Sequence, residues 1–420
     1  MLSTASNTYF ALIDANNFYA SCERLFRPDL DHQPIVVLSN NDGCVIARSN
    51  EAKDLGVEMG IPFYKIRDLC HRHHIHIFSS NYALYGDLSQ RLMNLISAQY
   101  SAMEVYSIDE AFILLNPNEQ HLIDQLRYDI RQQIGIPVSI GIGPTKTLAK
   151  VANYIAKKVL HQPIFTLDQS NIEWLKHIRI EDVWGIGRQW SKKLIALNIH
   201  TAQDLANTNP ALIQKAFNVV LMRITKELNG ISCLALEQPS DKKSILSSKS
   251  FSKPLQDYHL INQALSSYCA RACQKLRAQQ SKAGYIQVFL KTNPFSKKRP
   301  QYHNTCGYLL TTPTDDTRLL VSSAKMCLKA IFRNGYTYHK TGIMLSNLQP
   351  NHIQQHHLLY DHIDLNDSMM TVLDRINHRF GKNTLKIAAE GLQQQWRPRC
   401  QKKSPNYTTR WSEIVQAICH

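Results

Sequence analysis

Two adjacent acidic residues interrupt an apolar run at residues 106–115 (YSIDEAFILL). The run is typical of a buried strand, where an unpaired carboxylate costs several kcal/mol. Asp109 and Glu110 therefore need cations beside them or a turn that exposes them. Neighbouring side chains on a regular strand point to opposite faces, so we expect a turn or distortion that brings both carboxylates to one place.

A third acidic residue, Asp14, ends an apolar segment at residues 8–14 (TYFALID). If this strand and the strands around 103–115 are neighbours in one sheet, three carboxylates meet at one sheet end. Such anions repel one another unless cations lie between them, and Mg²⁺ suits all-oxygen sites that also bind phosphates. The sequence thus predicts two Mg²⁺ ions for an in-line phosphoryl displacement. The alternative is an acidic hairpin tip that is simply exposed.

The order of the predicted elements indicates the fold class. Strands, a long helix at 81–100, a strand pair at 103–115 and a helix at 145–158 predict an α/β sheet with antiparallel members. A chain of 420 residues is expected to form two to four domains. We therefore expect a multidomain α/β and α+β protein. Its predicted parts are 1–170 with an inserted subdomain at about 40–78, an all-helical region at 171–237, a polar linker at 238–250, a small α+β domain at 251–350, and a linker with a C-terminal extension at 351–420.

Two basic features point to phosphate ligands. Lys146, Lys150 and Lys157 fall on nearly one face of the predicted helix 145–158 and could reach a polyphosphate, although a solvated lysine face is the alternative. The motif VWGIGRQWSKKL has its glycines between predicted helices 171–182 and 188–197. Backbone N–H groups of such a turn can approach a DNA phosphate closely. The DNA-binding candidates are Gly185, Gly187, Arg188 and Lys192, and a plain helical turn is the alternative.

The net charge of +15 favours a polyanionic partner. Charge alone also permits a membrane surface or an acidic protein. No apolar stretch is long enough to span a bilayer, and the N-terminus lacks the basic start and apolar stretch of a signal peptide. We expect a cytoplasmic protein.

Six segments resemble one enzyme family. DANNFYASCE, SNNDGCVIAR, FSSNYALYGD, YSIDEAF, GIGPTKTLAK and DVWGIGR occur in the order found in Y-family translesion DNA polymerases. Further segments, among them AFNVVLMR, KTNPF, GLQQQW and SPNYTTR, are similar to the UmuC branch of that family. The resemblance covers essentially the whole chain.

The resemblance implies a right-hand polymerase. Its ferredoxin-like palm and small fingers would occupy 1–170, with the fingers at about 40–78. A helical thumb with a helix-hairpin-helix would occupy 171–237, and an α+β little finger 251–350. The implied activity is error-prone, template-directed addition of dNTPs to a primer 3′-OH in SOS mutagenesis and DNA repair.

The resemblance also implies roles for individual residues. Asp14, Asp109 and Glu110 would be the catalytic residues and, with the backbone carbonyl of Ala15, would hold two Mg²⁺ ions. Tyr19 would be the steric gate that excludes a 2′-hydroxyl. The remaining dNTP-binding candidates are Phe18, Asn50, Lys53 and Lys157. Many relatives have Tyr and Arg where this chain has Asn50 and Lys53, and a lysine binds as a point charge rather than a fork.

The implied partners are primer-template DNA, a UmuD′-like dimer, RecA and the sliding clamp, with the protein at the bacterial nucleoid when active. The clamp-binding candidates are Gln355, Leu358 and Tyr360, for which an ordinary polar linker is the alternative. Two rival functions stay open at this point. One is a nucleotidyl cyclase, which has no use for a helix-hairpin-helix. The other is a catalytically inactive DNA-binding UmuC-like protein.

Overall fold

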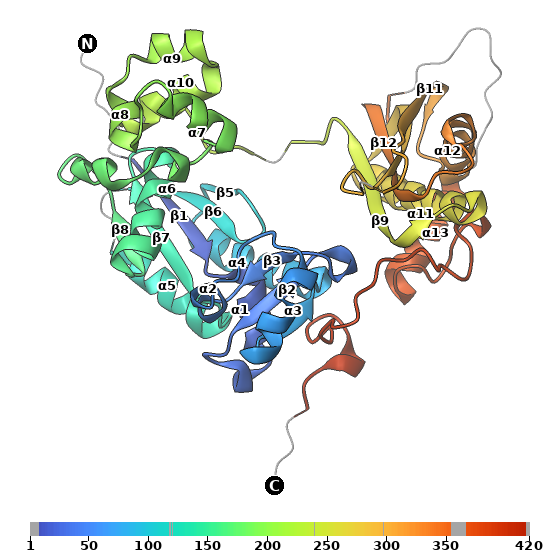
Figure 1. The fold of residues 1–420 in the computed structure, drawn as a ribbon, viewed down its shortest axis with the longest axis horizontal. Helices are drawn as coiled ribbons and strands as arrows, with labels where there is room; N and C mark the ends of the chain where they lie inside the picture. The colour runs from blue at the N-terminus through green and yellow to red at the C-terminus, as the bar shows by residue number, and fades with distance from the viewer. Residues whose placement is uncertain are drawn as a thin grey trace. The chain divides into compact units, whose positions relative to one another are not determined.

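The computed structural model describes residues 8–116, 119, 121–238, 240–296, 298–353 and 367–416. The chain forms two compact units (Figure 1). The first unit contains residues 1–39, 43–239 and 402–420, and the second contains residues 40–42 and 240–401. The predicted C-terminal extension 351–420 is therefore divided between the units. In the described part of the chain, no helix is both long enough and apolar enough to cross a membrane.

A five-stranded sheet forms the centre of the first unit, in the order β5-β6-β1-β7-β8. All neighbouring strands run antiparallel except β7 and β8, which are parallel, as the predicted fold class requires. The strands are β1 (Tyr9–Ala15), β5 (Met103–Val105), β6 (Glu110–Leu115), β7 (Val138–Gly143) and β8 (Ile164–Thr166).

Alternating side chains of β1 build two cores, one on each face of this sheet. Ala11 and Ile13 pack in a core with α1, α4 and α5, whereas Phe10 and Leu12 pack with residues of β6 and α6 on the other face. The helices are α1 (Phe18–Leu25), α4 (Tyr82–Gln99), α5 (Leu122–Gln133) and α6 (Lys146–Tyr154). A π-helical turn, Ile155–Leu160, continues α6.

The predicted inserted subdomain has its own sheet and core. Three strands lie in the order β3-β2-β4, and Val36, Leu38 and Val45 pack with Ile66 beneath them. The elements are β2 (Ile35–Leu38), β3 (Val45–Arg48), α2 (Asn50–Asp54), α3 (Phe63–Arg72) and β4 (His76–Ser79). Its loop at 40–42 is grouped with the second unit.

The predicted all-helical region is helical, but its first predicted helix is wrong in type. Residues 171–182 form two short 3₁₀ helices, Ile172–His177 and Ile180–Asp182, and not one α-helix. Extended backbone at Ile178 and Arg179 separates them, because that stretch makes a β-bridge from Arg179 to Thr201. The α-helices are α7 (Arg188–Ile195), α8 (Ala202–Asn207), α9 (Pro210–Ala216) and α10 (Val219–Leu228).

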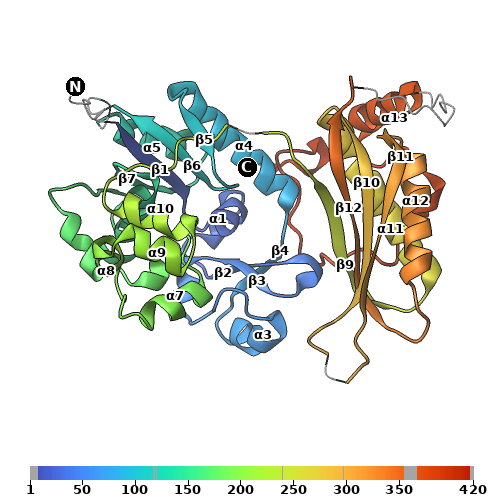
Figure 2. The same cartoon turned by 90° about the horizontal axis from the view of Figure 1, so that it is seen from above.

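The second unit is a four-stranded antiparallel sheet with two long helices packed on it (Figure 2). The elements are β9 (Ile245–Leu255), α11 (Tyr258–Ala278), β10 (Ser281–Thr292), β11 (His303–Thr314), α12 (Thr317–Ile331) and β12 (Tyr338–Pro350). This matches the predicted α+β domain, but the predicted linker 238–250 is wrong in its second half. There Ile245 and Ser247 are buried on either side of exposed Leu246, and all three pair with β12. The polar sequence at 245–250 therefore forms a strand and not a linker.

The second unit ends with α13 (Asp367–Phe380) and a 3₁₀ helix, Ala388–Glu390. Residues 381–401 contain no strand. Trp396 instead joins the core of the second unit by packing edge-on against Tyr268.

Candidate active site

The strand register brings the predicted acidic residues together. In the β1–β6 pair, Asp14 lies opposite Glu110. Asp109 precedes the first residue of β6, and its carbonyl accepts a hydrogen bond from the Ala15 amide at 2.9 Å. The sequence-based prediction that these strands are neighbours is confirmed, as is the turn next to the acidic pair, since residues 107–109 form a bend.

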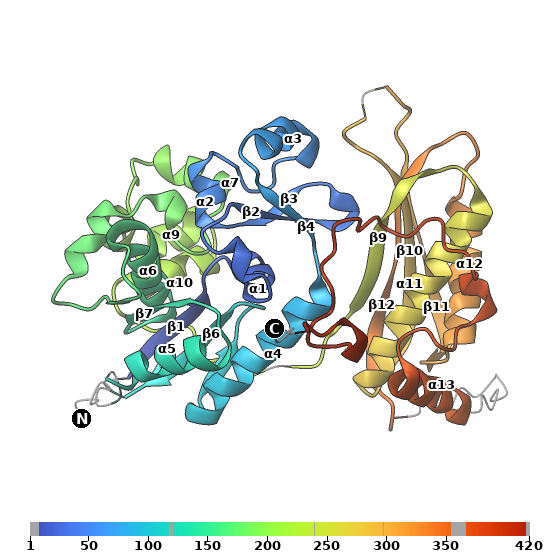
Figure 3. The same cartoon turned by 90° about the horizontal axis from the view of Figure 1, so that it is seen from below.

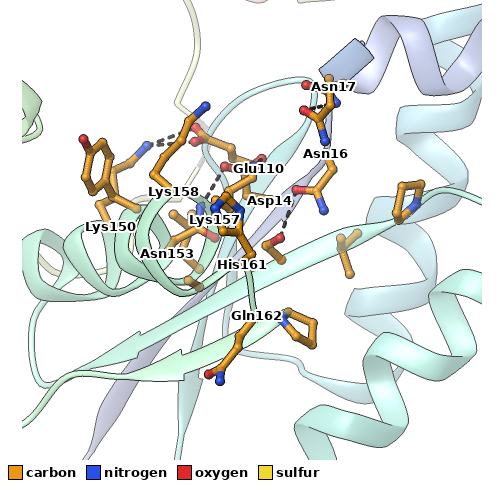
Figure 4. A pocket seen from close by; sticks show the side chains of 18 of the residues that line it. Asp14, Asn16, Asn17, Glu110, Lys150, Asn153, Lys157, Lys158, His161 and Gln162 are labelled. Carbon is orange, nitrogen blue, oxygen red and sulfur yellow. Dashed lines mark hydrogen bonds and ion pairs between the residues drawn. The ribbon is translucent and has the colours of Figure 1, made fainter. Parts of the chain in front are cut away.

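Each carboxylate has a polar partner. Asp14 accepts hydrogen bonds from Lys157 Nζ and Asn153 Nδ2, both at 2.8 Å (Figure 4). Lys150 Nζ lies 3.0 Å from both carboxylate oxygens of Glu110. The Asp109 carboxylate accepts a bond from the Ser107 hydroxyl at 2.5 Å.

The three acids interact electrostatically. Burial is the largest cause that raises the pKa of Glu110. Lys150 opposes that rise, and the charges of Asp14 and Asp109 add to it. Repulsion of this kind is what a divalent cation would relieve.

The donor set fits a hard divalent cation, because it consists of carboxylates next to a buried backbone position, Ala15. Within the described ranges, no three His, Cys, Asp or Glu side chains are already arranged as metal ligands. Lysines supply the positive charge beside Asp14 and Glu110 instead. Both of these ion pairs are only partly buried.

Asn153, which binds Asp14, is a site residue that sequence reasoning missed, and Lys150, predicted to reach a polyphosphate, pairs with Glu110. With Lys157 they lie three and four residues apart and so share one helix face, which was the available signal. Asn153 is buried, and its Oδ1 has no hydrogen-bond partner. Lys146, which was predicted to share this role, is buried and paired with Glu104, so it cannot reach a ligand.

An aromatic cage holds Lys150 in place. Its Nζ lies 4.4 Å from the ring centre of Tyr106 and 5.4 Å from that of Trp184. Trp184 Nε1 also donates a hydrogen bond to the Tyr106 hydroxyl at 3.1 Å. The YSIDEAF and DVWGIGR motifs, far apart in the sequence, therefore meet at this lysine.

A cavity of about 710 Å³ opens beside these groups. Figure 4 shows Asp14, Glu110, Lys150 and Lys157 along it, with Asn16 and Asn17 at the start of α1. Its further polar lining residues include Asn50, Lys53, Arg127, Ser139, Asn153, Lys158, His161, Gln162 and Asp182. Tyr19 and Asp109 are not among its lining residues. Lysines thus line the cavity that ends at the acidic residues.

Lys53 is held by neutral groups and surrounded by cations. It donates hydrogen bonds to the side chains of Asn17 and Asn50. Burial is the largest cause that lowers its pKa to about 8, and the next are the charges of Lys158, Arg48 and Lys157. An anion in the cavity would reverse this shift.

Tyr19 lies flat on a second tyrosine. Its ring is stacked on that of Tyr85 at 4.5 Å between centres and 18° between planes. Burial raises the pKa of Tyr19, and Tyr82 and Asp109 add to the rise, which places Asp109 near this ring. Phe18, predicted to contact a nucleotide, is only 3% exposed and belongs to the core. Its side chain lies in the core because it is on the sheet-facing side of α1.

The two glycines of the VWGIGRQWSKKL motif differ in why glycine suits their position. Gly185 has a φ of 83°, and a Cβ there would lie 2.7 Å from Ile224 Cδ1. A Cβ at Gly187, the N-cap of α7, would meet open space. Arg188 and Lys192 are exposed on α7. The clamp-binding candidates Gln355, Leu358 and Tyr360 lie outside the described residues.

Comparison with known proteins identifies the family. The chain matches the impB/mucB/samB family over residues 13–154, the C-terminal domain of that family over 242–358, and a domain of unknown function (DUF4113) over 367–417. Protein UmuC of Salmonella typhimurium is 44% identical over 419 residues, covering 97% of this chain and 99% of the relative. DNA polymerase IV of Ureaplasma parvum is 25% identical over 347 residues, covering 80% and 93%.

A solved structure has the same fold. A Y-family DNA polymerase chimera of Dbh and Dpo4 superimposes with a TM-score of 0.66 at 20% identity, over 81% of this chain and 99% of the other. Palm, fingers, thumb and little finger are therefore the appropriate names for the parts described above. The identity to UmuC over nearly the full length does not favour the cyclase or an inactive protein. The chain belongs to the impB/mucB/samB family and is a UmuC-like, Y-family translesion DNA polymerase.

Proposed function

We propose that error-prone synthesis takes place at the palm edge formed by Asp14, Asp109 and Glu110, where dNTPs are added to a primer 3′-OH during SOS mutagenesis and DNA repair. The observation that carries this assignment is the register of β1 with β6, which sets Asp14 opposite Glu110 beside Asp109. Both paired carboxylates have lysine partners that can leave.

The three carboxylates and the Ala15 carbonyl would hold two Mg²⁺ ions. Bound there, the ions supply activation of the attacking hydroxyl and charge neutralisation of the triphosphate. Lys150 and Lys157 act as stand-in counter-charges for Glu110 and Asp14. When the acids take other partners, Lys157 is free to meet a phosphate.

The triphosphate would lie along the lysine-lined cavity. Burial, and then the charges of Lys158, Arg48 and Lys157, lower the pKa of Lys53 there. Asn17 and Asn50 orient the Lys53 ammonium through hydrogen bonds. The positive charge of the cavity and the orientation of the Lys53 ammonium are thus set before the nucleotide binds.

Sugar selection would rest on Tyr19. Its ring is backed by Tyr85, so it cannot retreat when a nucleotide presses on it. A 2′-hydroxyl would clash with the ring, and a deoxyribose would not. Discrimination then comes from exclusion of the wrong sugar.

The thumb would hold the DNA backbone. The open N-terminus of α7 at Gly187 and the exposed Arg188 and Lys192 supply N–H donors and positive charge without base recognition. This fits a polymerase that accepts many template sequences.

The finer partner assignments rest on the resemblance to UmuC. They are a UmuD′-like dimer, RecA and, through Gln355, Leu358 and Tyr360, the sliding clamp. The proposed place of action is the nucleoid of a bacterial cytoplasm.

Primer extension on a damaged template tests the assignment. The full chain is supplied with Mg²⁺, dNTPs, a UmuD′ dimer and RecA filaments, because a subunit of this type can be weak alone. Extension that stops when the metal is chelated is the expected result. Cyclic dinucleotide formation would favour a cyclase, and DNA binding without extension would favour an inactive protein.

A further inference from the structure

The end of the described chain packs on the palm and fingers. Ser79, the last residue of β4, donates its amide to the Lys402 carbonyl at 2.9 Å, and its hydroxyl accepts the Lys402 amide at 3.0 Å. Ser79 also forms a parallel β-bridge with Lys403. The dark red segment beside β4 in Figure 3 is this stretch. Residues 402–416 fall in the region that the family comparison matches to a domain of unknown function.

Ser404 and Pro405 bind the start of helix α4. Asn81, the N-cap residue of α4, accepts the Leu84 amide with its side-chain oxygen. Its side-chain nitrogen lies within 3.1 Å of the Ser404 carbonyl, the Ser404 hydroxyl and the Pro405 carbonyl. The C-terminal segment therefore fixes the first turn of α4, which carries Tyr85.

Ser404 also binds a carboxylate that lies away from the acidic edge. Glu23 is 1% exposed, and its Oε1 accepts hydrogen bonds from the Tyr85 hydroxyl at 2.5 Å and the Ser404 hydroxyl at 3.0 Å. Its other oxygen has no partner. Burial raises the pKa of Glu23, while these two hydroxyls and Lys403 oppose the rise. Each hydroxyl therefore matters for holding this buried group.

The rest of the segment is anchored independently. Tyr407 stacks on Phe26, with 4.6 Å between ring centres and 17° between planes. Asn406 binds Glu413 through its amide and its side chain, and Arg410 pairs with Glu413 at 2.8 Å. Removing one hydroxyl at Ser404 would leave these contacts in place.

These contacts end at the sugar-selecting residue. The Tyr85 ring, whose hydroxyl is held by Glu23, is the surface on which Tyr19 stacks. Tyr82, one position after the Asn81 cap, contacts Tyr19 edge-on at 6.1 Å. The same segment thus acts on both tyrosines that confine Tyr19.

We propose that residues 402–413 are a positioning element for sugar discrimination: Ser404 fixes Glu23 and the start of α4, and these fix the Tyr85 ring that supports Tyr19. This role rests on the proposed function of Tyr19. It assigns a purpose to a segment that contacts neither the acidic residues nor the lysine-lined cavity.

Single-nucleotide extension with matched dNTP and rNTP tests this role. The full chain is assayed under conditions in which the unsubstituted protein extends a primer. Ser404→Ala should lower the dNTP-to-rNTP ratio of kcat/KM about three- to tenfold, the size expected for the loss of one ordinary hydrogen bond. The change should come from a lower KM for the rNTP, with dNTP kinetics within about twofold. The matched control is Ser412→Ala, an exposed serine of the same segment.

Tyr85→Phe gives the same test if Ser404→Ala does not fold, because it removes only a hydroxyl and keeps the stacked ring. The double variant should lower the dNTP-to-rNTP ratio by less than the two single effects combined, since both substitutions remove a hydrogen bond to Glu23. An equal fall in kcat/KM for the dNTP and the rNTP would overturn the inference.

Tyr19→Ala separates the two levels of the proposal. If it relaxes sugar selection while Ser404→Ala and Tyr85→Phe do not, Tyr19 remains the steric gate and the positioning role of residues 402–413 is wrong. If Tyr19→Ala leaves selection unchanged, the gate itself fails, and the role of the C-terminal segment fails with it.

Discussion

Two carboxylate sites in the first unit are built on opposite principles. At the palm edge, Asp14 and Glu110 are partly exposed and are paired with lysines that line an open cavity. Glu23 is buried, and its Oε1 accepts hydrogen bonds from the hydroxyls of Tyr85 and Ser404. A cation can be replaced by another cation with little rearrangement. The Glu23 carboxylate is instead held by two hydroxyls, and the charge of Lys403 acts on it without a direct ion pair being its support.

This difference separates chemistry from positioning. Charges that exchange partners suit a site where metal, nucleotide and pyrophosphate come and go. A charge with fixed hydrogen-bond partners suits a support that must not move. Substitution at the palm edge should therefore change rate more than stability, and substitution at Glu23 should change stability more than rate.

The largest expected effect is at the palm edge. Asp109→Asn should lower kcat for extension about 10³-fold or more, because metal-assisted charge stabilisation supplies several kcal/mol to such reactions. Affinity for primer-template DNA should stay within about twofold, because Asp109 is not on the thumb. Stopped-flow extension and a DNA-binding titration measure the two quantities.

Asp124→Asn is the matched control, since Asp124 is an exposed residue on α5. It should leave both quantities unchanged. Retention of more than a tenth of the wild-type rate by Asp109→Asn would remove Asp109 from the catalytic residues.

The buried site gives the next largest effect. Glu23→Ala should lower the free energy of unfolding by about 3 kcal/mol, because it leaves the Tyr85 and Ser404 hydroxyls without their acceptor and opens a cavity. Glu110→Gln should change it by no more than about 1 kcal/mol, because relief of repulsion from Asp14 and Asp109 offsets the lost Lys150 pair. Urea unfolding measures both.

The exposed Glu58 provides the control through Glu58→Ala. Equal destabilisation by Glu23→Ala and Glu110→Gln would erase the proposed distinction between the two carboxylate sites.

The next prediction concerns Lys53, a cation of the palm cavity whose charge should depend on pH. Its pKa of about 8, lowered by burial first and then by Lys158, Arg48 and Lys157, means that it loses its proton as the pH rises through 8. A bound triphosphate favours the charged form, so nucleotide affinity should be constant below pH 7 and should fall as the pH rises above 8. The fall should approach about tenfold per pH unit.

The Kd of a dNTP for the complex with a primer that lacks a 3′-OH isolates this step from chemistry. Lys53→Arg should remove the fall, because arginine stays protonated throughout this range. The same decline in Lys53→Arg as in the wild type would assign the titration to another group.

The acidic site could be predicted from sequence because it depends on strand order and register. TYFALID and YSIDEAF each end or begin a strand at an acidic residue, and antiparallel pairing then forces Asp14 opposite Glu110. The lysine partners of the acidic residues could be predicted only in part. Spacing placed Lys146, Lys150 and Lys157 on one face, but only the structure shows that Lys146 is buried against Glu104.

Features made by long-range contacts could not be read from the chain. The strand β9 at Ile245 has a polar sequence and exists because β12 offers it a pairing edge. Glu23, Tyr85 and Ser404 lie in three separate sequence segments, and nothing local marks them as partners. Local patterns predict elements, and tertiary pairing decides which polar residues become buried.

The smallest effect is expected at the thumb, where the exposed cations of α7 would bind DNA. Arg188→Ala and Lys192→Ala should each weaken primer-template binding a few-fold and reduce the slope of log affinity against log salt by about 1, since each removes one phosphate contact. Lys215→Ala, an exposed lysine on α9 of the same thumb, is the control and should leave the slope unchanged. Fluorescence anisotropy across a salt series measures the slopes. An unchanged slope in both α7 variants would mean that the glycine turn and α7 do not face the DNA backbone. The exchange of ionic partners would then be confined to the palm cavity.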